Sequence, residues 1–320
     1  MIDFNNLTDE SINQQVFFGN IDAANWQTWQ KPKNCKYVYI TSIGSGGGGG
    51  AGRRSTSNTT YGGGGGGSGA VTSGFFQAAV LPDVLYVQVG SGGVGGVGSS
   101  IQANGGAGVA GEISYVAVGP NTGTAYIVLQ SGTVPAGGGS GGTVSNGTLG
   151  AGETAWGLTG AFTNLGQVIT VAGQNGTNGA TSTANATSIT LNKIVSGGAG
   201  GGGTSSGAAV SNGGNITGAG IVPTISGIAG GIDGRKAGSG YQTRMPGKTY
   251  TARDPLIFTG GAGAGGYVND AGFHFASSGG DGSLGSGGGG GGGCNYRTGT
   301  NGVSGNGGRG GDGVVIITCF

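Results

Sequence analysis

The sequence predicts an all-β protein in which short strands flank a bundle of extended glycine rods, with almost no α-helix. Three observations lead to this prediction. Runs of β-branched and aromatic residues alternate with a period of two and end at Gly. Blocks of consecutive Gly separate these runs, and 86 of the 320 residues are Gly. Apolar residues nowhere keep helical spacing over several turns without an intervening Gly, so no long helix is expected.

Residues 1–35 differ in composition from the rest and are predicted to form a separate N-terminal anchor. This segment contains a single Gly, Gly19. Its aromatic side chains form either a local core or cap, or an apolar docking face for a partner. The four that would attach the segment are Phe17, Phe18, Trp26 and Trp29.

The rest of the chain, 36–320, is predicted to form one continuous domain. Strands are expected at 36–43, 84–89, 113–118, 125–130 and 314–320, with weaker candidates at 168–171 and 188–194. One helical turn near 8–13 is the only helix expected.

Six glycine tracts of similar length lie between these segments. They are 46–50, 62–67, 137–142, 197–203, 260–266 and 287–293. A chain usually contains only one or two flexible linkers between domains. Here six tracts recur, and each is separated from the next by a segment whose sequence predicts folded structure. The tracts are therefore predicted to be ordered.

Ordering each Gly costs roughly 1–2 kcal/mol of backbone entropy, and Gly has no side chain to offset it. Backbone hydrogen bonds can offset it if the tracts adopt the extended, three-residue-per-turn polyproline-II geometry, which directs N–H and C=O groups outward. Tracts lying side by side would then bond to one another, and the missing Cβ would let them approach closely. Gly becomes a packing requirement in such a bundle.

The charge balance excludes several classes of partner. There are 13 Lys and Arg against 12 Asp and Glu, so no basic field is available to bind nucleic acid or anionic lipid. No apolar run approaches the roughly 20 residues that span a bilayer, so membrane insertion is not expected, and no positively charged leader opens the chain. The three Cys are expected to be reduced thiols, with a Cys35–Cys319 bridge as the alternative.

Catalysis is not expected, and neither a cofactor nor a metal is predicted. The only His, His274, lies between Phe273 and Phe275, which is typical of an aromatic cluster, and the acidic residues are spread along the chain without a distinctive pair. Matches to GxGxxG follow from composition alone, so they do not predict a dinucleotide site.

Large and charged residues fall between the glycine tracts, because a glycine lattice has no room for them. Loops rich in Tyr, Arg and Trp at the end of a rigid scaffold have the composition of recognition surfaces. They could equally cap the lattice or contact neighbouring subunits. The candidate receptor-binding residues are Arg53, Arg54, Tyr61, Trp156, Tyr241, Arg244, Lys248, Tyr250, Arg253, Phe273, His274, Tyr296 and Arg297.

The strand at 36–43 running into GSGGGGGAG, the segment VLYVQVGSGGVGGVG and the ending GGRGGDGVVIITCF resemble the glycine-rich domain of bacteriophage tail-fibre and adhesin proteins. The sequence is similar in style to the fibre-tip adhesins of T-even-like phages, in which stacked polyglycine-II helices carry binding loops. The resemblance implies a protein of the virion surface, attached to other virion proteins and contacting a bacterial surface glycan or outer-membrane protein, with a homo-oligomer left open. A capsid decoration or head-fibre protein is the alternative, and a cellular glycine-rich wall protein is a third.

Overall fold

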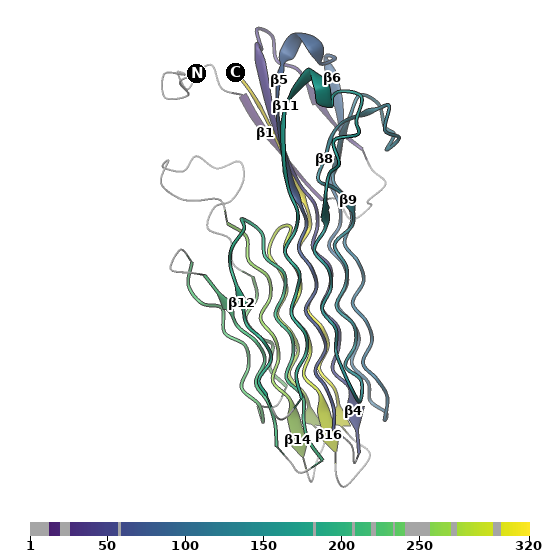
Figure 1. Cartoon of the computed structure of the whole chain (residues 1–320), viewed down its shortest axis with the longest axis vertical. Coiled ribbons are helices and arrows are strands. Elements are labelled where there is room, and N and C mark those ends of the chain that lie inside the picture. The colour runs from purple at the N-terminus through teal and green to yellow at the C-terminus, as the bar shows by residue number, and fades with distance from the viewer. Residues whose placement is uncertain are drawn as a thin grey trace.

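The computed structural model describes residues 13–19, 26–56, 59–181, 184–206, 209–218, 222–232, 234–240, 257–269, 274–296 and 302–320. Within these ranges the regular structure consists of strands and two short 3₁₀ turns, η3 (Ala78–Val80) and η4 (Thr163–Leu165), which confirms the all-β prediction. The molecule is elongated, with two larger sheets at one end, a bundle of parallel extended segments in the middle and small strands at the other end (Figure 1).

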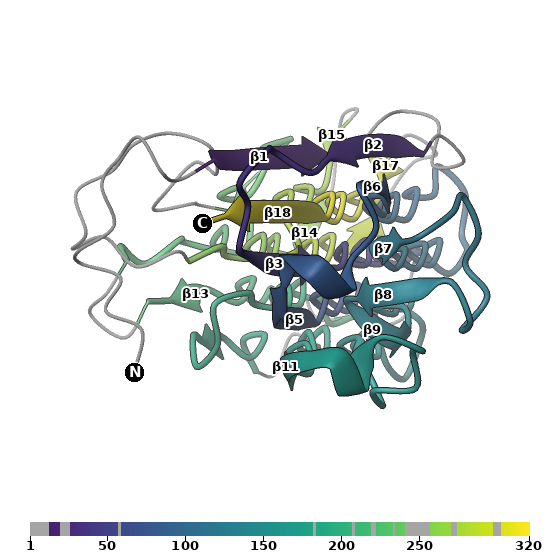
Figure 2. The same ribbon diagram turned by 90° about the horizontal axis from the view of Figure 1, so that it is seen from above.

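The larger sheet has five antiparallel strands in the order β1-β18-β3-β5-β11. These are β1 (Asn13–Phe18), β18 (Val314–Cys319), β3 (Tyr37–Ile43), β5 (Val71–Gln77) and β11 (Gly166–Val171). The second sheet has the order β2-β6-β7-β8, with β2 (Gln27–Gln30), β6 (Val84–Gln88), β7 (Tyr115–Ala117) and β8 (Ile127–Gln130). Seen from above, both sheets cover the same end of the bundle (Figure 2).

The two sheets enclose one hydrophobic core, because alternate side chains of each sheet point toward the other. Val38, Ile40 and Phe76 come from the larger sheet, and Leu85 and Val116 from the smaller one. All five are fully buried. We call this end the sandwich end.

Strand prediction succeeds for most of the continuous β-branched runs and misses β5 (Val71–Gln77). β3, β6, β7, β8, β11 and β18 lie within or beside the predicted segments, whereas the segment at 188–194 contributes only β12 (Ile189–Thr190). The seven-residue β5 was not predicted, because Gly74 breaks its apolar pattern. A Cβ at Gly74 would lie 2.6 Å from Phe76 Cε2 and 2.7 Å from Leu129 Cδ1, so this Gly makes room for the core.

The change of composition at residue 35 does not coincide with a boundary between sheets. β1 pairs with the C-terminal strand β18, and β2 pairs with β6, so both described strands of the N-terminal segment belong to the sandwich. Asn13 begins β1, and the remainder of the helical turn expected at 8–13 lies outside the described residues. The N-terminal segment contributes to the same core as the glycine-rich part.

The glycine tracts are extended segments, here called rods, that bond to one another in rotation. Successive N–H groups of rod 46–52 donate to three different neighbours, and every third residue returns to the same one. Gly46, Gly49 and Gly52 donate to the carbonyls of Gly311, Gly308 and Gly305, respectively. Gly47 and Gly50 donate to Gly67 and Gly64. Gly48 and Ala51 donate to Val109 and Gly106, and all seven distances are 2.8–2.9 Å. This period of three is what an extended helix with three residues per turn requires.

The carbonyl groups of the same rod accept from three further segments. Gly46 and Gly49 accept from Gly93 and Gly96, Gly47 and Gly50 from Gly288 and Gly291, and Gly48 and Ala51 from Gly139 and Gly142. Rod 46–52 therefore lies among six hydrogen-bonded neighbours. Its backbone groups are satisfied without any side chain, as buried backbone requires.

Five of the six predicted Gly tracts are inner rods, whereas the tract at 137–142 is partly exposed. The tracts at 46–50, 62–67, 197–203, 260–266 and 287–293 are buried throughout, whereas mixed segments such as 91–98 and 303–313 alternate buried and exposed positions. Among the described Gly, positive φ occurs only at Gly231, Gly234 and Gly285. Gly is thus required in the rods for close packing and not for a left-handed backbone.

Short strands occupy the rest of the molecule. At the end opposite the sandwich, here the far end, β14 (Tyr267–Asn269), β16 (Cys294–Tyr296) and β4 (Arg54–Ser55) form one sheet, and β15 (His274–Phe275) pairs with β17 (Gly302–Val303). Two further pairs join β9 (Gly132–Val134) to β10 (Thr154–Ala155), and β12 to β13 (Ile216–Thr217).

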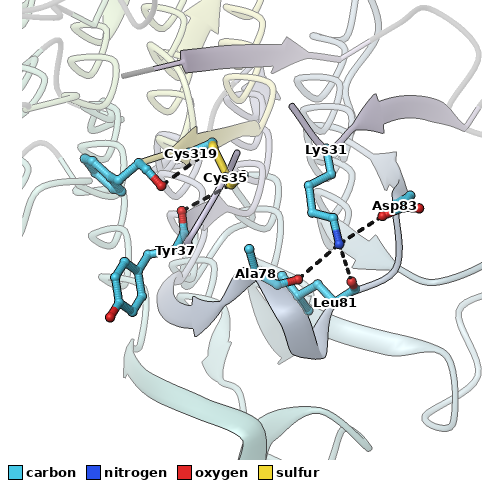
Figure 3. The surroundings of a disulfide bond; sticks show 8 residues. Lys31, Cys35, Tyr37, Ala78, Leu81, Asp83 and Cys319 are labelled. Atoms are coloured by element: carbon cyan, nitrogen blue, oxygen red, sulfur yellow. Dashed lines mark hydrogen bonds and ion pairs between the residues drawn. A yellow bond between two sulfur atoms is a disulfide. The ribbon is translucent and has the colours of Figure 1, made fainter. Parts of the chain in front are cut away.

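A disulfide joins Cys35 to Cys319, contrary to the expectation of reduced thiols (Figure 3). The two residues are separated by 284 positions in sequence, but β18 pairs with β3, which brings their Cα atoms to 5.7 Å. Beside the bridge, Lys31 Nζ donates to the carbonyls of Ala78 and Leu81 at 3.1 and 2.9 Å and forms an ion pair with Asp83 at 3.0 Å. Cys294 is buried and is not part of the disulfide.

Candidate functional site

The rod bundle holds two different ends of the molecule at a fixed separation. The sandwich end carries the C-terminal residue Phe320, whose N–H donates to Tyr37 O at 3.0 Å. The far end carries several of the residues that the sequence analysis selected for recognition.

Arg54 and Tyr296 lie in paired strands of one sheet at the far end, and His274 lies in the separate β15–β17 pair. β16 pairs in parallel with both β4 and β14, which sets Cys294 opposite Arg54. The guanidinium carbon of Arg54 lies 6.0 Å from the centroid of the Tyr296 ring, within cation–π range. The rings of Tyr267 and His274 are 5.6 Å apart and tilted by 31°.

These residues form an internal layer and do not protrude, which corrects the sequence interpretation. Arg53 is 8% exposed, Arg54 4% and Tyr296 1%, and Tyr61 and His274 are half-buried. The physical reason is that rods end in short strands, and large side chains placed there cover the rod ends before any loop begins. We call Arg53, Arg54, Tyr267, His274 and Tyr296 the far-end layer.

Arg53 is a buried cation whose side-chain partner among the described residues, Asn104, is neutral. Its Nη1 donates to Asn104 Oδ1 at 3.2 Å, whereas its Nε has no hydrogen-bond partner. Within the described ranges no carboxylate forms an ion pair with Arg53. A buried guanidinium without a counter-charge favours an incoming anion, because burial raises the free energy of an unpaired charge.

Trp156 was predicted to belong to this recognition surface, and the structure corrects that prediction. Its side chain is 2% exposed and packs in the sandwich core, next to β9 and β10. Phe17 and Trp29 are also core residues, at 2% and 1% exposed, so they serve as the local core and not as a docking face. Trp26 packs partly buried against that core, and Phe18 is 47% exposed.

The remaining predicted site residues lie outside the described residues. They are Tyr241, Arg244, Lys248, Tyr250, Arg253, Phe273 and Arg297.

One buried acid at the junction of sandwich and rods was not predicted from sequence. Glu153 is 1% exposed; Ser131 Oγ donates to its Oε1 and Ala70 N to its Oε2, both at 2.7 Å. Burial raises the pKa of Glu153 to about 8, which outweighs the opposing effect of the two hydrogen bonds. Burial also raises the pKa of nearby Tyr115, and Glu153 adds to that shift.

A second unpredicted feature is a set of Asn side chains that replace missing rods at the edge of the bundle. Asn175 and Asn178, three residues apart, accept the N–H groups of Gly152 and Leu149 at 2.8 Å. The same relation repeats elsewhere: Asn212 and Asn215 accept from Gly230 and Gly227, and Asn306 from Gly98. The amide oxygen occupies the position of a neighbouring carbonyl, which closes the lattice laterally.

The described part of the chain contains no cluster of three or more His, Cys, Asp and Glu suited to a metal ion. Over those same residues, no helix has the length and apolar character needed to cross a membrane.

The fold thus defines a protein built on a hydrogen-bonded glycine bundle capped by a β-sandwich. A family model described as a glycine-rich domain matches residues 22–215, which is more than half of the 320-residue chain, and the protein belongs to that family. No curated protein matches the chain.

Proposed function

We propose that this protein is a non-enzymatic component of a phage virion surface, a tail-fibre or spike-tip adhesin that presents its far end to a host cell. The observation that supports the proposal is the inner rod lattice, in which each N–H of 46–52 bonds to a neighbouring rod. A lattice of this kind holds one end of the molecule at a fixed distance from the other. Recognition residues on a rigid scaffold lose little entropy on binding.

The composition of the far end supports contact with a bacterial surface glycan or outer-membrane protein. Arg53 supplies a buried cation without an ionic partner in the described ranges, and Arg54 lies against an aromatic ring. Arg donates two parallel hydrogen bonds to carboxylate or phosphate groups, which are common chemistry on such surfaces.

The sandwich end is the proposed attachment end. The outer face of the five-stranded sheet carries Phe18 at 47%, Tyr39 at 40% and Ile169 at 63% exposure. Of the four predicted attachment residues only Phe18 remains available on this face. An exposed apolar sheet face is typical of a surface that another protein covers.

The alternative is a capsid decoration or head-fibre protein, and one observation favours it. Val94, Val97 and Val109 are 61%, 73% and 57% exposed on two adjacent outer rods, where Val109 N donates to Val94 O. Such a flank suits side-by-side contact between neighbouring copies in a particle. Copy number separates the two functions, since hundreds per virion favour decoration and a few per tail favour an adhesin.

The adhesin proposal is tested by measuring how the purified protein affects adsorption of virions to host cells. We expect purified protein to bind host cells and to compete with virions for adsorption. Replacing Tyr241, Arg244 and Tyr250 together by Ala should abolish the competition, whereas the control Tyr126→Ala, an exposed Tyr at the sandwich end, should not. Unchanged competition by a folded triple variant would show that this loop does not recognise the host.

A further inference from the structure

A polar trough lies on the flank of the bundle. It has a volume of about 300 Å³, and its lining includes Arg235, Lys236, Ser278, Asp281 and Asn306. None of these five belongs to the residues selected from sequence as receptor-binding.

Three chain segments build the trough, and their backbones are bonded to one another. Segment 235–237 lies beside Ser278, because Ser278 N donates to Arg235 O and Ala237 N to Ser278 O, both at 2.8 Å. On the other side, Gly279 N donates to Asn306 O at 2.9 Å. The floor at 278–279 is therefore held rigidly between two walls, and Gly279 leaves it without a side chain.

The acid of the trough is already neutralised. Asp281 Oδ2 forms an ion pair with Lys236, and its Oδ1 accepts the backbone N–H of Arg309 at 2.9 Å. Asp281 therefore offers little to a cationic ligand, and Lys236 has only its remaining N–H groups to donate.

Several donors of the trough remain uncommitted. Within the part of the chain that the structure describes, the Arg235 guanidinium, the Ser278 hydroxyl and the Asn306 Nδ2 group have no partner, while Asn306 Oδ1 is held by Gly98 N at 2.7 Å. The charges of Lys236 and Asp281 cancel, so Arg235 gives the lining of the trough a net charge of one positive unit. The trough thus combines an unpaired cation, neutral donors and a rigid polar floor.

We propose that this trough binds an acidic sugar unit, an oxyanion carried on a polyhydroxylated ring. Arg235 would receive the carboxylate or phosphate through charge-assisted hydrogen bonds, and Ser278 and Asn306 would bond to ring hydroxyls. The volume of about 300 Å³ suits a single sugar ring and lies at the lower limit of ligand sites. That the sugar belongs to a bacterial surface polysaccharide rests on the proposed function.

Titration of the full chain with defined sugars tests the proposal. Glucuronate and glucose 6-phosphate are the two acidic ligands, glucose is the neutral ring, and inorganic phosphate is the anion without a ring. We expect the amide resonances of Gly279 and Gly307 to shift with at least one acidic sugar. Its affinity should exceed that of glucose and of inorganic phosphate by about tenfold, the effect of one charged hydrogen bond.

Two variants, each lacking one positive charge, distinguish binding in the trough from non-specific electrostatic attraction of the anion to the protein. Arg235→Gln should weaken binding of the acidic sugar about tenfold or more. Arg309→Gln removes an exposed cation from an adjoining rod, where Arg309 pairs with Asp312, and should leave the affinity nearly unchanged. Equal loss in both variants, equal binding of glucose or phosphate, or no resonance shift would each overturn the proposal.

Retention of bacteria on immobilised protein separates this inference from the proposed function. If cells are retained and Arg235→Gln retains them equally while no acidic sugar binds, the adhesin function stands and the trough proposal fails. If an acidic sugar binds in the trough but no cells are retained, the trough stands and the adhesin function fails.

Discussion

At the residue scale, Gly49 shows why the rods require Gly. A Cβ at Gly49 would overlap the carbonyl oxygen of Gly289 on the neighbouring rod, and backbone of an inner rod cannot move aside. Gly157 provides the contrast, since the nearest atom to a Cβ there is Thr159 Cγ2 at 4.0 Å.

Gly49→Ala is expected to lower the free energy of unfolding by about 1–3 kcal/mol or more, because the added methyl overpacks the lattice. Gly157→Ala is expected to leave it unchanged or raise it by about 0.4–1 kcal/mol, because it only restricts the unfolded chain. Denaturant unfolding of both variants measures the difference. Equal effects would show that rods 46–52 and 287–293 are not packed as described.

Glu153 makes stability depend on pH. In the folded protein its pKa is raised from 4.5 to about 8, so between these values the folded state holds a proton that the unfolded chain has released. The contribution of Glu153 to stability is therefore greatest below about pH 4.5 and falls through this window by up to about 1.4 kcal/mol per pH unit.

The conservative variant Glu153→Gln removes this titration and keeps the acceptor for Ala70 N. Denaturant unfolding at pH 5, 6.5 and 8 should show a weaker decline with pH in the variant than in the wild type. Parallel pH profiles would contradict a neutral buried carboxyl at this position.

At the element scale, the outer rods are completed by side chains. Asn178 supplies the acceptor that Leu149 N would find on a further rod, and Asn175 does the same for Gly152 N. The spacing of three residues places both side chains on one face of the rod.

Asn178→Ala is expected to release the Leu149 amide to solvent and to lower the free energy of unfolding by about 0.5–1.5 kcal/mol. Hydrogen exchange should become faster at Leu149, while Gly152, held by Asn175 at 2.8 Å, acts as an internal control. Uniform acceleration at both amides would indicate that the whole rod opens and that the side-chain acceptor is not local.

At the scale of the whole molecule, the disulfide joins the start of the domain to its last strand. Cys35 and Cys319 are 284 residues apart, and a loop of this length gives about 5.6 kcal/mol of stabilisation in the chain-entropy model. The rods bond through backbone alone and do not depend on the bridge.

Reduction is expected to lower the melting temperature and to leave the folded β structure intact. The double variant Cys35→Ser/Cys319→Ser should melt like reduced wild-type protein and should not respond to reductant. Circular dichroism with and without reductant measures both effects. A reductant-dependent shift in the double variant would point to Cys294 as the responsive thiol.

Much of this fold follows from local sequence. Uninterrupted β-branched runs predict β3, β6 and β18, and pure Gly tracts predict the inner rods, because both signals lie within a few consecutive residues. The candidate site was less predictable. Trp156 and Tyr296 were expected to be displayed, yet both are buried, because burial depends on which segments meet.

The sequence by itself determined that the chain is a helix-poor protein of nearly zero net charge whose Gly tracts must be rods, since Gly that is ordered needs backbone partners. Only the tertiary structure decided which rods are neighbours, that β1 completes the sheet with β18, that Cys35 meets Cys319, and that Arg235 stands over a polar trough. These facts depend on contacts between residues tens to hundreds of positions apart. A lattice of nearly identical Gly segments carries no side-chain code for that arrangement.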